Sequence, residues 1–179
     1  RRLGFEEVFR LTLAALLNKQ EAQGSHSQII GFEEALAKEF VKNLDFQLTD
    51  AQRRAIWQIY LDMQRTTPMN RLIEGDVGSG KTVVAAMAAL MANASNYQVA
   101  MMAPTELLAR QLAQEMHKLL KPLGQSGHVG LLIGGMTANQ KQLARQKIAD
   151  GSVAIIVGTH AIIQENINMK NLGLVIIDE

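Results

Sequence analysis

Eight residues, 75 to 82, combine three glycines with a lysine and a hydroxyl at fixed spacing. They read Gly-Asp-Val-Gly-Ser-Gly-Lys-Thr and fit the pattern G-x-x-x-x-G-K-[ST]. Glycines let backbone N–H groups approach an anion closely and surround it at the start of a helix. Lys81 would add a positive charge for the β- and γ-phosphates of a nucleotide, and the Thr82 hydroxyl would ligate Mg²⁺. The predicted phosphate loop comprises Gly75, Asp76, Val77, Gly78, Ser79, Gly80, Lys81 and Thr82.

The elements around this loop decide between phosphate binding and a plain glycine-rich turn. Residues 69–74 offer a short strand, although only Leu72 and Ile73 are strongly apolar. Residues 83–91 have the composition of a helix. A strand, a glycine-rich loop and a helix in this order favour phosphate binding.

A second motif closes the chain, where the apolar run 174–177 is followed by Asp178 and Glu179. Ligands bind at the carboxyl edge of parallel strands, so two acids at this point can meet a nucleotide. Asp178 would hold Mg²⁺, and Glu179 would polarise the water that attacks the γ-phosphate. Two acids alone would indicate only a solvated loop, but with the phosphate loop they favour a nucleotide triphosphatase.

Gln52 has two interpretations that the local sequence supports equally. Thr49-x-x-Gln52 is a capping box, in which the glutamine side chain accepts the N–H of the helix cap. Alternatively, the Gln52 amide reads the edge of adenine, with Phe46 offering a face to the base. Both interpretations use the same amide geometry, so the choice stays open.

Alternating helices and short apolar strands follow residue 49 and predict an α/β domain with a parallel sheet covered by helices. We expect helices near 50–65, 80–93, 105–121 and 138–149, and strands near 71–74, 97–102, 128–133, 153–157 and 172–177. Apolar periodicity predicts two further helices, over 3–17 and from about 31 to 41. We therefore divide the chain into a helical linker, 1–45, and an α/β domain, 46–179.

Composition limits the partners of the chain. Its 179 residues are 47% hydrophobic, enough for one core, and 18 Lys and Arg nearly balance 17 Asp and Glu. Net charge alone thus gives no case for nucleic acid or membrane binding. There is no cysteine, which excludes disulfides and thiolate metal sites. The longest apolar runs are too short to span a bilayer and no signal peptide is evident, so we expect a cytoplasmic protein.

Five blocks of sequence carry a resemblance to a known family. They are Phe46-x-Leu48-Thr49-x-Ala51-Gln52, GDVGSGKT at 75–82, APTELLA at 103–109, GTHA at 158–161 and LVIIDE at 174–179. Together they resemble the first motor domain of superfamily-two DNA helicases, most closely the RecG family of branch-migrating, ATP-dependent helicases. Transcription-repair coupling translocases share much of this pattern but usually carry a bulky aromatic where this chain has Ser79. Ser79 therefore favours the RecG family.

The resemblance implies a RecA-like parallel sheet with helices on both faces, and ATP with Mg²⁺ as cofactors. It also implies forked or junction DNA as partner, in recombination and repair. A second motor domain and a wedge domain belong to such proteins. The chain starts at Arg1 and ends inside a motif, so we expect a fragment whose sheet has a gap beside the strand ending at Asp178. Such a fragment should bind nucleotide weakly and hydrolyse it negligibly.

The same resemblance assigns DNA contacts to two strand ends. Pro104, Thr105 and Glu106 follow a strand and open a helix, where N–H groups and the Thr105 hydroxyl could hold a phosphate. Gly158 and Thr159 follow another strand. The alternatives are a plain helix cap and a plain turn. Contacts of this kind would follow a DNA backbone without reading its sequence.

Three other functions compete with a DNA helicase: a coupling translocase, a phosphotransferase with the same phosphate loop, and a scaffold without turnover. Intact Lys81, Thr82, Asp178 and Glu179 argue against the scaffold. The APTELLA and GTHA blocks argue against the phosphotransferase.

Overall fold

The sheet is parallel and four-stranded in the computed structural model of the chain, with strand order β2-β3-β1-β4. The structure describes residues 6, 9, 12, 13, 26–160, 162 and 167–178, so most of the helix predicted over 3–17 lies outside the described residues. The strands are β1 (Gln98–Met102), β2 (Val129–Leu132), β3 (Ile155–Gly158) and β4 (Leu172–Ile177). Their carboxyl ends meet at one edge, since Met102 is paired with both Gly158 and Ile177.

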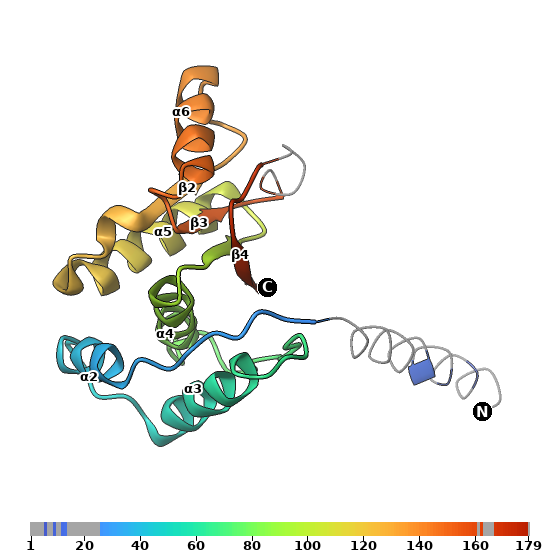
Figure 1. The fold of residues 1–179 in the computed structure, drawn as a ribbon, viewed down its shortest axis with the longest axis vertical. Coiled ribbons are helices and arrows are strands. Elements are labelled where there is room, and N and C mark those ends of the chain that lie inside the picture. The colour runs from blue at the N-terminus through green and yellow to red at the C-terminus, as the bar shows by residue number, and fades with distance from the viewer. Residues whose placement is uncertain are drawn as a thin grey trace.

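The helices begin and end close to their predicted positions (Figure 1). They are α2 (Glu34–Lys42), α3 (Asp50–Met63), α4 (Lys81–Ala94), α5 (Glu106–Leu120) and α6 (Ala138–Ala149), with short 3-10 turns η1 (Lys121–Leu123) and η2 (Ser126–His128). Hydrogen bonds from capping side chains explain where several of these helices begin. Thr49 and Thr137 each form a complete capping box, and Thr105 caps α5. The capping box read from sequence at Thr49 is therefore confirmed.

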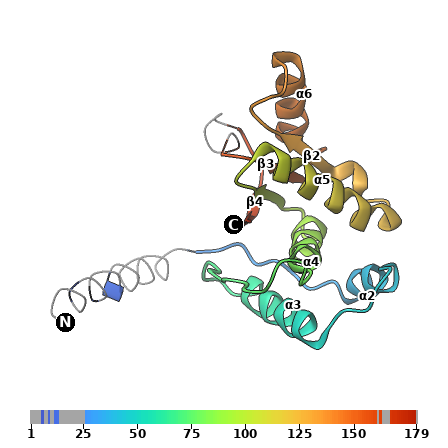
Figure 2. The ribbon, with the colours of Figure 1, turned by 180° about the vertical axis from the view of Figure 1, so that it is seen from behind.

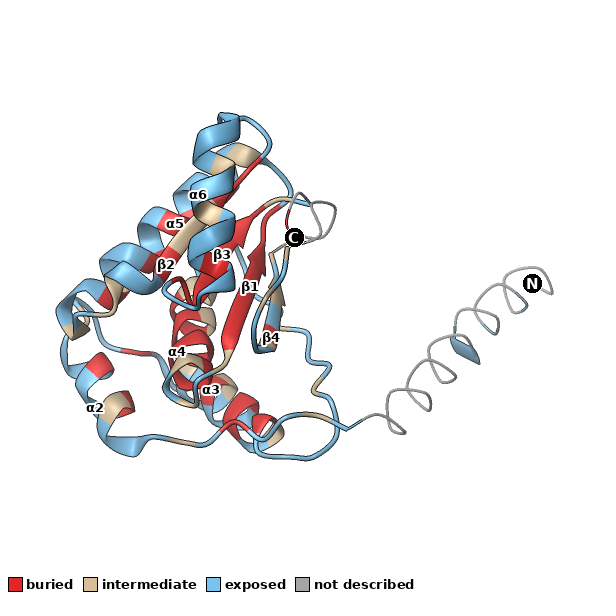
Figure 3. Ribbon diagram, turned by 45° about the horizontal axis from the view of Figure 1, so that its top comes forward, coloured by how far each residue is buried: buried red, intermediate tan, exposed pale blue. Residues whose placement is uncertain are grey.

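Both faces of the sheet are covered, because side chains of successive strand residues point to opposite faces. Val99 and Met101 of β1 belong to the larger core, which includes α3, α4 and α5. Ala100 and Met102 face a smaller core that contains Ile148 of α6. Figure 2 shows α6 apart from α3 and α4, and Figure 3 shows α4 as the most buried helix. The predicted α/β fold with helices on both faces is confirmed.

The segment before the predicted motor domain packs against it. Backbone N–H groups of Ile30 and Gly31 donate to the Met63 carbonyl, at 3.0 Å, and to the Ser95 hydroxyl, at 3.0 Å. Phe40 of α2 is 1% exposed and lies in the larger core. Residues 26–45 are thus part of the same packed unit, and the domain boundary at 45 stays a prediction.

The strand predicted over 71–74 is wrong. These residues have no regular secondary structure and no ladder pairing, and Leu72 is 89% exposed. A strand exists only where its backbone groups pair with a neighbour, and the outer edge of β4 pairs with no strand in the described part of the chain. An ion pair holds this segment instead, with Arg71 Nε donating to Asp62 Oδ2 of α3 at 2.7 Å. Among the described residues, no helix is long and apolar enough to span a bilayer.

Candidate functional site

The glycine-rich loop joins the 71–74 segment to α4. Gly78 and Gly80 have φ angles of 82° and 79°, in the left-handed region that side chains rarely adopt. Gly80 is the residue before α4, and a Cβ there would collide with the Gln52 amide nitrogen. Its left-handed backbone conformation requires glycine at this position, and a Cβ would in addition force the Gln52 amide to move.

Lys81 points back into the loop that precedes it. Its Nζ donates to the carbonyl of Gly75 at 2.6 Å and to that of Asp76 at 3.0 Å. The Ser79 N–H donates to the Asp76 carbonyl at 3.1 Å, which closes the turn. An ammonium has three donors, so Lys81 can exchange these carbonyls for phosphate oxygens without a change in its position along the helix.

Gln52 forms the capping box and also touches the loop. Its Oε1 accepts from the Thr49 N–H at 2.9 Å, and its own N–H donates to Thr49 Oγ1 at 3.2 Å. Its Nε2 donates to the Ser79 carbonyl at 2.8 Å, a contact that the sequence pattern did not reveal. Phe46 is 48% exposed and lines a separate hollow with Arg53. The reading of adenine by Gln52 and Phe46 stays a prediction.

Asp178 follows β4 at the carboxyl edge of the sheet, where its N–H donates to the Met102 carbonyl at 2.8 Å. Gly75, Lys81, Thr82 and Asp178 line one groove. The fold therefore brings the two predicted Mg²⁺ ligands to the phosphate loop, and a hydroxyl and a carboxylate are the oxygen ligands that Mg²⁺ takes. Glu179 lies outside the described residues.

The strand ends predicted to touch DNA lie at the same edge. Pro104 and Thr105 are exposed, and Thr105 Oγ1 accepts from the Leu108 N–H at 3.3 Å. Gly158 is buried, and a Cβ there would collide with the Leu132 carbonyl, so its side-chain position is closed to DNA. Thr159 is half-buried. The backbone around these residues remains the candidate for phosphate contacts.

Glu106 is engaged with the protein itself. Its carboxylate accepts from the Gly135 N–H at 2.8 Å, and a Cβ on Gly134 or Gly135 would lie within 2.9 Å of its oxygens. The Gly134-Gly135 turn follows β2, so it belongs to the same edge as Thr105 and Thr159. Sequence reasoning missed this turn, although two glycines directly after an apolar strand were the available signal.

A family model of the DEAD/DEAH box helicases matches residues 49–179. The chain belongs to the DEAD/DEAH box helicase family. The match includes the phosphate loop, the APTELLA and GTHA blocks and the final acids, so the recognition of a helicase motor from these motifs is confirmed.

Similar proteins narrow the position of this helicase domain within the family. The ATP-dependent DNA helicase RecG of Aquifex aeolicus is 44% identical over the whole chain, and that of Escherichia coli K12 is 45% identical. The chain covers 22% and 26% of these relatives, respectively. It thus spans about a quarter of the length of the proteins that it matches.

Solved structures agree with this placement. A structure of RecG bound to a three-way DNA junction matches 99% of the chain, with a TM-score of 0.87, 44% identity and 24% of that chain covered. A hypothetical ATP-dependent RNA helicase from Sulfolobus tokodaii matches 82% of the chain and 41% of its own length, with a TM-score of 0.60 and 19% identity. The second likeness concerns the fold alone.

Proposed function

We propose that this domain is the ATP-binding part of a RecG-type DNA helicase that remodels forks and junctions in recombination and repair. The observation that carries the proposal is the groove shared by Lys81, Thr82 and Asp178 at the end of the glycine-rich loop. The similarity to RecG bound to a three-way DNA junction, at 44% identity over 99% of the chain, supports branched DNA as the substrate. Work on DNA would take place in the cytoplasm.

The residues of the loop would bind the triphosphate and orient it. Loop N–H groups and the start of α4 would surround the β- and γ-phosphates, because the exposed N–H groups at a helix start attract anions. Lys81 would leave the carbonyls of Gly75 and Asp76 for phosphate oxygens. Thr82 and Asp178 would hold Mg²⁺, which neutralises charge on the phosphates when bound. Glu179 would take the proton of the attacking water.

The strand ends would follow a DNA backbone. We propose that N–H groups around Thr105 and Thr159 donate to phosphates, which gives contact without sequence readout. Glu106 would hold the Gly135 N–H instead of contacting phosphates, because its carboxylate and a phosphate are both negatively charged. A second motor domain would close the ATP site with an arginine, and a wedge domain would split the fork.

The experiment uses the full-length protein that carries this domain. Glu179→Gln should abolish hydrolysis of ATP stimulated by forked DNA and leave nucleotide affinity intact. Lys81→Met should lose both ATP hydrolysis and nucleotide affinity. Unchanged turnover in Glu179→Gln removes that residue from water activation. Turnover that responds equally to forked and linear DNA would instead overturn the assignment to branched substrates.

A further inference from the structure

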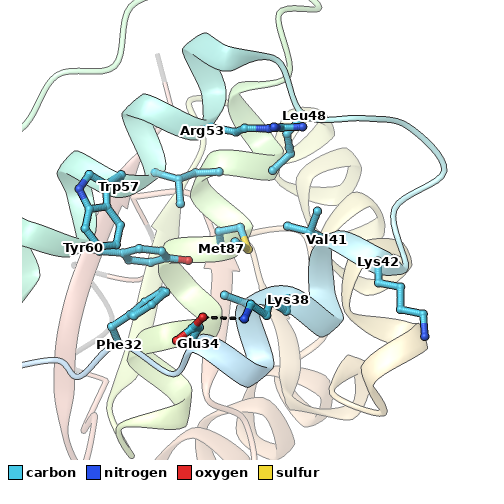
Figure 4. A pocket seen from close by; sticks show the side chains of 12 residues that line it. Phe32, Glu34, Lys38, Val41, Lys42, Leu48, Arg53, Trp57, Tyr60 and Met87 are labelled. Carbon is cyan, nitrogen blue, oxygen red and sulfur yellow. Dashed lines mark ion pairs between the residues drawn. The ribbon is translucent and has the colours of Figure 1, made fainter.

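The pocket between α2, α3 and α4 is separate from the phosphate loop. It has a volume of about 700 Å³, within the range of small-molecule sites. Its lining is mainly apolar, with Phe32, Val41, Trp57 and Met87 around it (Figure 4). No residue of the phosphate loop lines it. Its function therefore has to be sought apart from ATP binding.

The Tyr60 hydroxyl is an unpartnered polar group in this pocket. Tyr60 is 4% exposed, and its hydroxyl is the one buried side-chain polar atom without a hydrogen-bond partner among the described residues. Figure 4 shows it pointing toward Met87 in the middle of the pocket. A buried donor without an acceptor is unfavourable, and an acceptor on a ligand would satisfy it. Met87 is unbranched, so a rotamer change can open the path.

Charge at the rim selects the kind of ligand. Glu34 and Lys38 neutralise each other through an ion pair of 2.6 Å. Arg53, on the opposite side of the pocket in Figure 4, makes no ion pair with the residues that the structure describes. Trp57 lies near Arg53 on α3 and is 53% exposed. Its ring packs edge-on against that of Phe32, with 5.9 Å between the two ring centroids. The rim thus offers a free guanidinium next to exposed aromatic surface.

From these features we infer a second binding site, for a small apolar anion. Its ring system or acyl body lies on Trp57 and Met87, an acceptor on it takes the Tyr60 hydroxyl, and its anionic group meets Arg53. This site is independent of the ATP groove. A ligand held here would contact both α3 and α4, the helices that carry Gln52 and Lys81.

The test uses the single tryptophan of the chain as reporter. The protein is labelled with 5-fluorotryptophan and titrated with 6-hydroxynaphthalene-2-sulfonate, an aromatic anion whose hydroxyl oxygen can accept from Tyr60. In parallel, it is titrated with 2-naphthol, its neutral counterpart. We expect a saturable shift of the one fluorine signal, stronger binding of the anion, and no displacement by ATP with Mg²⁺.

Matched variants decide the outcome. Tyr60→Phe should weaken binding about fivefold, the effect of one hydrogen bond. Arg53→Gln, at an exposed position, should reduce the affinity for the anion toward that for the neutral naphthol, because Lys42, the other cation of the lining, extends away from the pocket in Figure 4. Tyr97→Phe and Arg110→Gln, outside the pocket, should change nothing. Absence of a saturable shift, as for a surface that takes only a partner protein, overturns the site. Equal binding in Tyr60→Phe, Arg53→Gln and the unaltered chain also overturns it.

Discussion

The Gln52 side-chain nitrogen donates to the Ser79 backbone carbonyl at 2.8 Å, and thereby ties the start of α3 to the phosphate loop 27 residues later. The same amide keeps its oxygen on the Thr49 N–H. One side chain therefore caps a helix and supports the loop that precedes α4. This arrangement leads to a first prediction.

Gln52→Glu should separate these two contacts. A carboxylate still accepts from the cap N–H, as capping boxes use either residue, but it cannot donate to the Ser79 carbonyl. We expect stability to change by less than about 0.5 kcal/mol. Nucleotide affinity should fall roughly fivefold, the effect of one hydrogen bond. Titration with a fluorescent ATP analogue measures this.

Gln140→Glu is the matched control for that substitution. Gln140 forms the equivalent capping box with Thr137 at the start of α6, away from the loop. Its substitution should leave nucleotide affinity unchanged. If both variants lose affinity equally, the contact between Gln52 and Ser79 has no role in nucleotide binding.

The Asp62–Arg71 ion pair should stabilise the fold more than an ordinary surface pair does. The Asp62 side chain is 14% exposed and also meets Arg65 at 3.2 Å. Asp62→Asn should lower the free energy of unfolding by about 1–2 kcal/mol, because it weakens two contacts of a largely buried carboxylate. Glu34→Gln breaks a pair with 67% and 75% exposed side chains and should cost clearly less stability, because solvent screens that pair. Unfolding in urea measures the free energy of unfolding of both variants. Equal losses of stability in Asp62→Asn and Glu34→Gln would contradict this expectation.

Glu106 should protect the Gly135 amide from hydrogen exchange. Glu106→Gln keeps an acceptor and should keep this protection, whereas Glu106→Ala should lose it, since the Gly135 N–H loses its partner. Hydrogen exchange followed by NMR measures the exchange rate of the Gly135 amide by itself. Slow exchange of Gly135 in Glu106→Ala would mean that the carboxylate does not hold the turn.

The burial of Tyr60 should make the stability of the fold decrease at alkaline pH. Burial raises the pKa of its hydroxyl in the folded protein, while an unfolded tyrosine ionises near pH 10, at about the reference value. Its contribution to stability is therefore complete below about pH 10 and is lost as the pH rises above it. Between pH 9 and 11, the unaltered chain should lose more stability than Tyr60→Phe.

Structural features that depend on a few neighbouring residues were predictable from the sequence alone. The glycines of the loop, the capping boxes at Thr49 and Thr137, and the periodicity of helices and strands all act over a few neighbouring residues. These local signals predicted the α/β fold, four of the five strands and the order of the motifs. They also identified the helicase family, because the motifs retain their spacing along the chain.

Only the tertiary structure decided which distant groups meet. It placed Asp178 in one groove with Lys81 and Thr82, joined Gln52 to Ser79, and turned Glu106 toward Gly135. It left the 71–74 segment outside the sheet, since strand formation depends on a partner that no local pattern specifies. The sequence by itself determined which groups could do chemistry. Packing of segments far apart in the chain determined their neighbours.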